Sequence, residues 1–375
     1  MSMISTPHGD SSSTVRVPLK DRSYEIEITS GRLGHAAARI QATLPDLSHA
    51  IVISDAAVHE PWAHPLSIDL ESSSNQTRVS HCTVPSGETS KSMVEFERIL
   101  AWLLEQGGDR RSVIIAVGGG VIGDLAGYVA ASFTRGIRFI QVPTTLLAMV
   151  DSSVGGKTGI NLPGAKNMVG AFWQPSLVLI DTDVLSTLPE RSYLSGLAEV
   201  IKYGVIDDAE FFDWLEFNAE ALVARDSEAL RHAIQVSCEC KARVVVEDER
   251  ETSGRRAILN YGHTFAHALE ATAGYGQLLH GEAVSIGMQM AVRLAIDLGL
   301  AEESLFKRQT DLLCACQLPI CLPDADPAAM LPVMMRDKKV AHGKLHFVLP
   351  TQLGSVQLVG GVHEDAVVRA IEASR

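Results

Sequence analysis

The sequence lacks the cysteine patterns of disulfide-rich and zinc-finger proteins. Its six cysteines, among 375 residues, form no C-x-x-C motif. We therefore expect no disulfide framework, as is typical of proteins of a reducing cytoplasm. The longest apolar stretch, 283–292, is too short to span a bilayer. Residues 1–14 are rich in serine and lack the apolar segment of a signal peptide, so we expect a disordered tail in a cytoplasmic protein.

An excess of positive charge is also absent. The chain has 32 lysines and arginines against 45 aspartates and glutamates, which gives a net charge of −13. Such a surface repels nucleic acid and anionic membranes, so neither is an expected partner. An anionic substrate would need a local basic pocket. The hydrophobic share of 46% provides ample material for a core.

The hydrophobic pattern changes character near residues 183–189. Before this boundary, apolar runs typical of strands alternate with helical spacing, which predicts an α/β domain with a parallel sheet over 15–185. After it, long helical patterns predict a mostly α-helical domain over 186–375. The expected strands are 15–19, 24–28, 51–53, 78–84, 113–117, 137–142 and 176–180, with a late hairpin at 345–349 and 355–359. The expected helices are 90–106, 121–132, 191–205, 227–247, 257–273 and 282–298.

A glycine-rich turn lies between an expected strand and an expected helix. Residues 118–123, GGGVIG, match G-x-G-x-x-G in the context that phosphate binding at a helix N-terminus requires. The alternative is a tight turn without a ligand. The next strand, 137–142, does not end in the acidic residue that usually binds ribose, and Asp55 after an earlier strand is the candidate for this role.

A second glycine-rich segment contains Lys157. Gly156, Lys157 and Thr158 look like the end of a P-loop, but Asp151 stands where that motif needs its first glycine. We therefore interpret Lys157 as an anion-binding lysine on a glycine-rich loop. A solvated loop lysine is the alternative.

Five polar residues share one face of the expected helix 257–273. Arg256, Asn260, His263, His267 and Glu270 are spaced by 4, 3, 4 and 3 residues. We call these residues the polar stripe. On a helix whose other residues are mostly apolar, the stripe indicates either a functional site or a solvated face.

A carboxylate and two histidines can form a metal site with an open position for substrate. Glu199, His263 and His280 are one candidate set, and His263 with His267 at i, i+4 is the rival pair. Imidazole and carboxylate ligands suit zinc, cobalt or iron.

Longer motifs give the chain a specific resemblance. They are GGGVIGDLAG (118–127), FTRGIRFIQVPTTLLAMVDSSVGGKTGIN (133–161), GAKNMVGAF (164–172), LAEVIKYG (197–204), LNYGHTFAHALE (259–270), LHGEAVSIGM (279–288) and RDKKVAHGKLHFVLP (336–350). From about residue 15 to about residue 370, the chain resembles the 3-dehydroquinate synthase family.

The resemblance implies an NAD-binding α/β domain followed by a helical metal- and substrate-binding domain. It implies conversion of 3-deoxy-D-arabino-heptulosonate 7-phosphate to 3-dehydroquinate and phosphate, a carbon–oxygen lyase step of the shikimate pathway. The substrate is transiently oxidised by NAD, loses phosphate by β-elimination, is reduced again and closes its ring in an intramolecular aldol step. The implied cofactors are NAD and a divalent metal, Zn²⁺ or Co²⁺.

The resemblance also implies roles for individual residues. The metal ligands are Glu199, His263 and His280. The catalytic residues are His267, Lys202, Asp151, Asn260 and Lys157. The substrate-binding residues are Arg135, Asn167, Lys241, Arg256 and one of Lys338 and Lys339. The NAD-binding residues are Asp55, Glu88, Lys91, Gly119, Gly120, Asp124, Thr144, Thr145, Lys166 and Thr187. Arg135 matches an arginine that reaches the phosphate from a neighbouring subunit, which implies a homodimer.

Other functions share parts of this pattern. A sedoheptulose 7-phosphate cyclase or a 2-deoxy-scyllo-inosose synthase would differ in the substrate pocket, where Arg256, Asn260 and His267 stand as in 3-dehydroquinate synthases. A polyol dehydrogenase related to iron-dependent alcohol dehydrogenases would release NADH, and the basic residues argue against it. A catalytically inactive binding protein would have lost some of the matched positions, which are all present.

Overall fold

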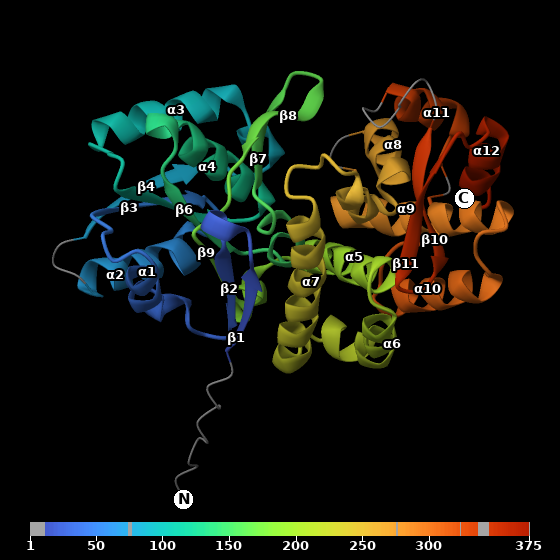
Figure 1. Cartoon of the computed structure of the whole chain (residues 1–375), viewed down its shortest axis with the longest axis horizontal. Helices are drawn as coiled ribbons and strands as arrows, with labels where there is room; N and C mark the ends of the chain where they lie inside the picture. The colour runs from blue at the N-terminus through green and yellow to red at the C-terminus, as the bar shows by residue number, and fades with distance from the viewer. Residues whose placement is uncertain (1–11, 74–76, 275–276, 323, 337–344, 375) are drawn as a thin grey trace, which may run out of the picture. The chain divides into compact units, whose positions relative to one another are not determined.

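The structure, a computed structural model, describes residues 12–73, 77–274, 277–322, 324–336 and 345–374. The chain separates into two compact units, Met1–Thr187 and Leu188–Arg375. The first is built on a mostly parallel sheet and the second is mostly helical (Figure 1), which confirms the expected fold class. In the part of the chain that is described, no helix combines the length and apolar character needed to cross a bilayer.

The sheet of the first unit has seven strands in the order β1-β2-β9-β6-β5-β3-β4. Only the β1–β2 pair is antiparallel. The strands are β1 (Ser13–Val17), β2 (Tyr24–Thr29), β3 (His49–Asp55), β4 (Arg78–Val84), β5 (Ser112–Gly118), β6 (Arg138–Pro143) and β9 (Leu177–Asp181). All residues of β5 are buried, as its continuous apolar run predicts for an inner parallel strand. β1 begins at Ser13, two residues before the expected strand.

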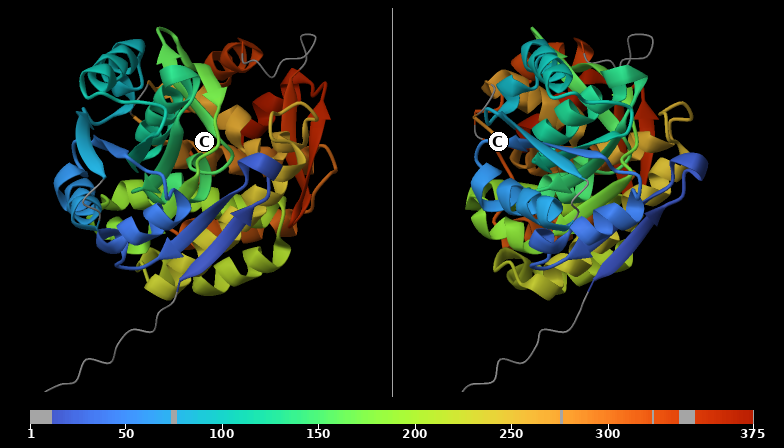
Figure 2. Two further views of the ribbon diagram at one scale, coloured as in Figure 1. Left: turned by 60° about the vertical axis from the view of Figure 1, so that its left-hand side comes forward. Right: turned by 90° about the vertical axis from the view of Figure 1, so that its left-hand side faces the viewer.

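Helices cover both faces of this sheet, with α3 and α4 on one face and α1 and α2 on the other (Figures 1 and 2). The helices are α1 (Ala37–Thr43), α2 (His64–Ser73), α3 (Met93–Glu105) and α4 (Gly120–Ser132). α3 starts later than expected because Ser92 caps it, its side chain accepting the N–H of Glu95 at 3.3 Å. The core between the sheet and helices α3 and α4 contains apolar residues of β3, β4, β5 and these two helices. Ile53, Ile114 and Val129 are among them.

The segment around Lys157 is a hairpin and not the expected loop. β7 (Lys157–Leu162) pairs antiparallel with β8 (Ala165–Phe172), and β7 packs on α4. A side chain at Gly170 would overlap the carbonyl oxygen of Thr158 on the facing strand. Gly159, in the glycine-rich segment around Lys157, is similarly close to the facing strand, since a Cβ there would lie 2.6 Å from the carbonyl oxygen of Val169. The close approach of the two strands therefore requires glycine at both positions.

Short 3₁₀ and π segments connect the longer elements. They are η1 (Lys20–Arg22), η2 (Leu33–His35), η3 (His59–Ala63), η4 (Glu88–Ser90), η5 (Phe133–Arg135), η6 (Ala148–Ser152), η7 (Thr182–Thr187) and η8 (Arg255–Asn260).

The second unit is organised around a deeply buried helix, α9. Its elements are α5 (Glu190–Ile206), α6 (Ala209–Val223), α7 (Ser227–Glu247), α8 (His263–Ala273), α9 (His280–Asp297), α10 (Glu303–Ala315), α11 (Pro327–Arg336), β10 (His346–Gln352), β11 (Ser355–Gly360) and α12 (Glu364–Glu372). α9 packs against α5, α8, α12 and β10, and every residue from Ala283 to Val292 is buried. Its apolar composition therefore places it in the core, as the sequence predicts.

The prediction of a single helix over 257–273 is wrong. Arg256 and Asn260 belong to the 3₁₀ segment η8, and α8 begins only at His263. Gly262 separates the two with a φ of 78°, and a side chain there would lie 2.8 Å from Met288. The left-handed turn breaks the helical register, so the polar stripe does not form one helix face.

Candidate active site

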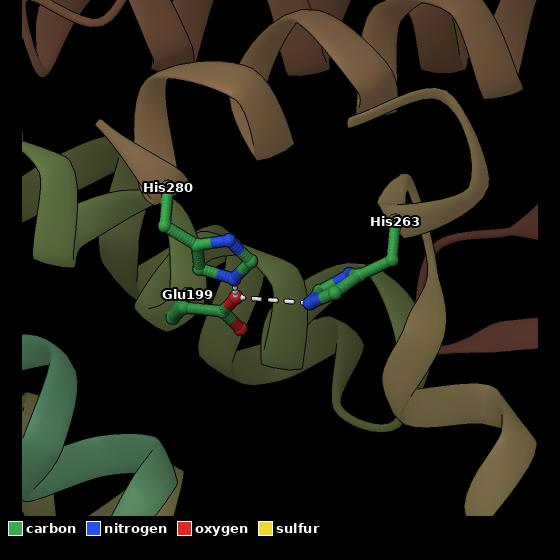
Figure 3. A group of neighbouring side chains, drawn as sticks. All are labelled: Glu199, His263 and His280. Carbon is green, nitrogen blue, oxygen red and sulfur yellow. Dashed lines mark ion pairs between the residues drawn. The ribbon is translucent and has the colours of Figure 1, made fainter. Parts of the chain in front are cut away.

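Three side chains from three helices meet in the second unit. Glu199 comes from α5, His263 from the first turn of α8 and His280 from the first turn of α9 (Figure 3). The Nε2 atoms of His263 and His280 lie 3.4 Å and 3.5 Å from Glu199 Oε1. One ligand atom from each residue lies within 4.8 Å of the others, and the described residues contain no second group of this kind.

The Glu199 carboxylate has unusual electrostatics for its depth. Its side chain is fully buried, and its carboxylate oxygens face the Lys202 ammonium and the Nε2 atoms of His263 and His280. Burial alone would raise the pKa of this carboxyl, but contact with the Lys202 ammonium and with His263 holds the pKa well below its usual range. A buried carboxylate is costly unless cationic or hydrogen-bonding groups face it. A carboxylate and two imidazoles within reach of one another therefore fit a divalent cation with an open coordination position.

The surroundings shift the pKa values of the two histidines in opposite directions. Burial lowers the pKa of His263 to about 4, so its imidazole is neutral near pH 7. Burial also acts to lower the pKa of His280, but Glu199 and Glu270 on either side outweigh it and raise the pKa to about 10. His263 Nδ1 contacts the carbonyl oxygen of Tyr261 at 3.0 Å, which leaves Nε2 directed at Glu199.

The start of α9 is fixed by polar contacts that orient His280. Glu282 accepts the backbone N–H of Leu279 at 2.8 Å, and Arg191 donates to both oxygens of Glu282 at 2.6 Å and 2.8 Å. The N–H of Gly281 donates to Ser195 Oγ at 3.0 Å. Because Ser195 lies one turn before Glu199 on α5, this contact brings two of the three site residues together.

His267 stands outside the three-residue group. It lies one turn after His263 on α8, with ring centroids 5.8 Å apart and planes at 88°. The ring centroid of His280 is closer to that of His263, at 5.2 Å. Of the two ligand sets left open by the sequence, the geometry brings together Glu199, His263 and His280.

Cationic side chains are buried around these helices. Lys202 on α5 is 1% exposed, Lys241 on α7 is 5% exposed and Arg256 on η8 is 2% exposed. These three elements pack against one another. Arg256 donates to the carbonyl oxygen of Glu249 at 2.8 Å. Buried lysines and arginines are rare unless they are paired, so these three elements concentrate basic side chains in the interior of an acidic protein.

The first unit places another set of predicted residues at one edge of its sheet. Asp55 ends β3, and Gly119 and Gly120 follow β5 at the start of α4. Thr144 and Thr145 follow β6, and the N–H of Thr144 donates to the Gly118 carbonyl at 3.0 Å. β3 and β5 are neighbours from which the chain continues in opposite directions, to β4 and to β6. Ligands of open α/β sheets bind at such a switch point, beyond the carboxyl ends of the strands.

A polar network joins the η4 turn to the β7–β8 hairpin. Lys91 Nζ contacts the carboxylate of Asp124 and the side-chain oxygen of Asn167. Asn161, which sequence reasoning missed, donates to Glu88 Oε1 at 2.7 Å and accepts the N–H of Asn167 at 2.8 Å. Its own N–H donates to the Lys91 carbonyl at 2.8 Å. The sequence signal that could have identified it is its place as the last residue of the motif 133–161.

The remaining predicted residues are spread over the first unit. Asp151 lies in η6, Lys157 and Lys166 in the β7–β8 hairpin, and Thr187 at the end of η7, where its hydroxyl accepts from the Trp62 indole at 2.8 Å. Lys338 and Lys339 lie outside the described residues.

Arg135 lies in a strained turn. Thr134, Arg135 and Gly136 have φ values of 48°, 72° and 122°, three consecutive left-handed residues. Residues other than glycine rarely adopt this conformation, and such strain is concentrated at functional sites.

Two family models match the chain. The model described as 3-dehydroquinate synthase N-terminal matches residues 81–195, and the model described as 3-dehydroquinate synthase C-terminal matches residues 196–340. Together they cover more than half of the sequence.

Individual proteins agree with the family models. A 3-dehydroquinate synthase from Rhodopirellula baltica is 61% identical over 367 residues, which are 96% of this chain and 97% of that protein. A 2-epi-5-epi-valiolone synthase from Streptomyces hygroscopicus subsp. jinggangensis, solved with NAD⁺ and Zn²⁺ bound, is 28% identical with a TM-score of 0.84, covering 93% of this chain and 96% of that one. A 2-deoxy-scyllo-inosose synthase complexed with carbaglucose-6-phosphate, NAD⁺ and Co²⁺ is 26% identical with a TM-score of 0.87. The match covers 97% of this chain and 100% of that one. The chain belongs to the 3-dehydroquinate synthase family.

Proposed function

We propose that this enzyme converts 3-deoxy-D-arabino-heptulosonate 7-phosphate to 3-dehydroquinate and phosphate, and therefore acts as a carbon–oxygen lyase. The observation that carries the proposal is the meeting of buried Glu199 with His263 and His280 beside buried Lys202. A site with metal-binding groups and fixed positive charge suits a polyhydroxylated, anionic sugar phosphate.

The metal is held by Glu199, His263 and His280, and it is Zn²⁺ or Co²⁺, the ions bound in the related synthases. NAD is held at the carboxyl edge of the sheet. Its residues are Asp55, Glu88, Lys91, Gly119, Gly120, Asp124, Thr144, Thr145, Lys166 and Thr187. When bound, NAD supplies reversible oxidation of a substrate hydroxyl and the metal supplies a Lewis acid for that oxygen.

The chain's own side chains bind and orient the substrate. Lys202, Lys241 and Arg256 can supply positive charge from positions that the packing of α5, α7 and η8 fixes. With Arg135, Lys157 and Asn167, and with Lys338 or Lys339, they are assigned to the substrate's phosphate, carboxylate and hydroxyl groups. Their charges also stabilise the departing phosphate dianion.

Proton transfer is assigned to His267, with Asn260 and Asp151 orienting the hydroxyl groups. His267 lies next to His263 on α8 and outside the Glu199–His263–His280 group, and an imidazole beside a metal site is suited to exchange protons with a bound substrate. The enzyme is further proposed to be a cytoplasmic homodimer in which Arg135 of one subunit reaches the substrate phosphate bound to the other.

The first test is phosphate release from 3-deoxy-D-arabino-heptulosonate 7-phosphate by the purified protein. The assay is run with and without NAD, and after chelation with Zn²⁺ or Co²⁺ added back. Release that requires both cofactors without accumulation of NADH supports the proposal. Turnover of sedoheptulose 7-phosphate instead would reassign the substrate, and steady production of NADH would indicate a polyol dehydrogenase.

A second experiment tests the metal ligands independently of turnover. His263→Ala should bind neither Zn²⁺ nor Co²⁺ stoichiometrically. The metal content per subunit is measured by elemental analysis after dialysis against buffer that contains a low concentration of the ion. The matched control is His363→Ala, because the His363 side chain is 81% exposed in the same unit. A metal content of His263→Ala equal to that of the wild type would refute the ligand assignment.

A further inference from the structure

Glu270 is the one member of the polar stripe to which the family resemblance assigns no role. It lies on α8, two turns after His263, on the same face of the helix. Its Oε2 atom is 3.7 Å from His280 Nδ1, while His280 Nε2 is 3.5 Å from Glu199 Oε1. The imidazole of His280 therefore lies between two carboxylates, one at each ring nitrogen.

The other ligand histidine has the same arrangement with a different acceptor. His263 Nδ1 contacts the Tyr261 carbonyl at 3.0 Å, and its Nε2 faces Glu199. An acceptor beside Nδ1 favours the tautomer that carries its proton there, which leaves the Nε2 lone pair for a metal ion. In both histidines the atom directed at Glu199 is thus Nε2.

The two imidazoles differ in how far packing restrains them. The side chain of His263 is 12% exposed, whereas that of His280 is 35% exposed. His280 is also the first residue of α9, where it has no preceding helical turn beneath it. Packing alone therefore leaves the His280 ring more freedom, and the attraction of a carboxylate 3.7 Å from Nδ1 favours the ring orientation and tautomer that direct an N–H toward it.

We propose that Glu270 is a positioning residue that holds the His280 imidazole with Nε2 toward Glu199 and so raises the affinity for the divalent metal. The inference rests on the proposed function, because it concerns the same metal site. Glu270 does not act as a fourth ligand, because its carboxylate faces the opposite ring nitrogen and it is absent from the group within 4.8 Å.

The test compares two variants that separate hydrogen bonding from charge. Glu270→Met removes the hydrogen-bond acceptor. The side-chain volume stays similar, and methionine, like glutamate, is a good helix former. Glu270→Gln removes the charge and keeps an oxygen that can accept from Nδ1. The matched control is Glu303→Ala, since Glu303 is 67% exposed in the same unit. Affinities for Zn²⁺ and Co²⁺ are measured by competition with a chelator, and the visible spectrum of bound Co²⁺ reports the ligand geometry.

The Met variant is expected to bind both ions about 10- to 100-fold more weakly, the usual effect of losing such an outer partner, with an altered Co²⁺ spectrum. The Gln variant and the control should stay close to the wild type. Equal affinity of the Met variant and the wild type would overturn the inference, and so would equal weakening by Met and Gln. Glu270→Ala replaces Glu270→Met if the latter does not fold. A wild-type protein that binds neither ion would instead overturn the proposed function.

Discussion

The backbone N–H of Gly281 donates to Ser195 Oγ at 3.0 Å, and residue 281 has no room for a side chain. A Cβ at this position would overlap the Ser195 carbonyl oxygen. Because α5 carries Glu199 and α9 begins at His280, this close approach sets the separation of two proposed metal ligands.

The first prediction is that Gly281→Ala weakens both the fold and the metal site. The added methyl group must push the start of α9 away from α5, and such overpacking costs about 1–3 kcal/mol. Thermal unfolding and chelator competition for Zn²⁺ measure the two effects. Gly34→Ala is the control, because a Cβ there meets nothing within 4 Å. An unchanged Zn²⁺ affinity in Gly281→Ala would show that the helix contact does not set the ligand geometry.

The second prediction concerns Asp248, which organises the loop before Arg256. Its carboxylate accepts the backbone N–H groups of Thr252 at 2.8 Å, Ser253 at 3.1 Å and Arg256 at 3.3 Å. Burial acts to raise the pKa of Asp248, but the N–H donors outweigh it and lower the pKa to about 2. The ionised carboxylate therefore stabilises the folded state above about pH 4, the value for an unfolded chain, and this contribution is lost as the pH falls toward 2.

Asp248→Asn should accordingly lower the thermal midpoint at pH 7, and the gap to the wild type should narrow toward pH 3. The Michaelis constant should also rise, since Arg256 is assigned to the substrate. Circular dichroism at both pH values and initial rates at pH 7 measure these effects. The control is Asp311→Asn, which replaces an exposed residue paired with Lys307. It should change neither the thermal midpoint nor the Michaelis constant. A gap that is the same at both pH values would contradict the assigned cause.

Sequence patterns predicted the elements that are stabilised locally or are apolar throughout. The expected helix 227–247 coincides with α7, and the expected strand 78–84 coincides with β4. Asp226 caps α7 by accepting the N–H of Ala229 at 2.9 Å, a signal that is present in the sequence itself. Such elements need no knowledge of distant residues.

The errors arose where distant contacts decide the backbone. Gly262 stands within an uninterrupted helical pattern, and only its left-handed φ and the lack of room for a side chain beside Met288 show that the helix must break. Likewise, Gly159 beside Lys157 is compatible with a loop, and only its close approach to Val169 on the facing strand shows that a hairpin forms. The sequence offered two metal sets containing His263, and the packing of α5 against α9 was needed to bring Glu199 and His280 together.

The third prediction is that Asn161 holds the proposed NAD- and substrate-binding residues in one arrangement. Its side chain connects Glu88 with the backbone of Asn167, whose φ of 57° is left-handed. Asn161→Leu removes both hydrogen bonds, each worth about 1 kcal/mol, so NAD affinity should fall roughly 10-fold or more. Calorimetric titration with NAD measures this. Asn218→Leu in the second unit loses one hydrogen bond, to Trp214, and should bind NAD normally. Normal NAD binding by Asn161→Leu would refute the connecting role.

The fourth prediction is that Arg135 acts across a dimer interface. Arg135→Ala should raise the Michaelis constant with little loss of bound metal, since the residue belongs to the other compact unit from the metal ligands. Co-expression of differently tagged Arg135→Ala and His263→Ala subunits provides the decisive sample. In a mixed dimer, the His263→Ala subunit lends its intact Arg135 to the site of its partner, which retains all three metal ligands.

Random assembly makes half of the dimers mixed, each with one complete site, so about a quarter of wild-type activity should return. Purification through both tags should raise this to about half, because every dimer is then mixed. If Arg135 instead served its own subunit, one site of the mixed dimer would lack the arginine and the other would lack the metal. Activity no greater than the sum of the two parent variants would therefore place Arg135 within its own subunit's site.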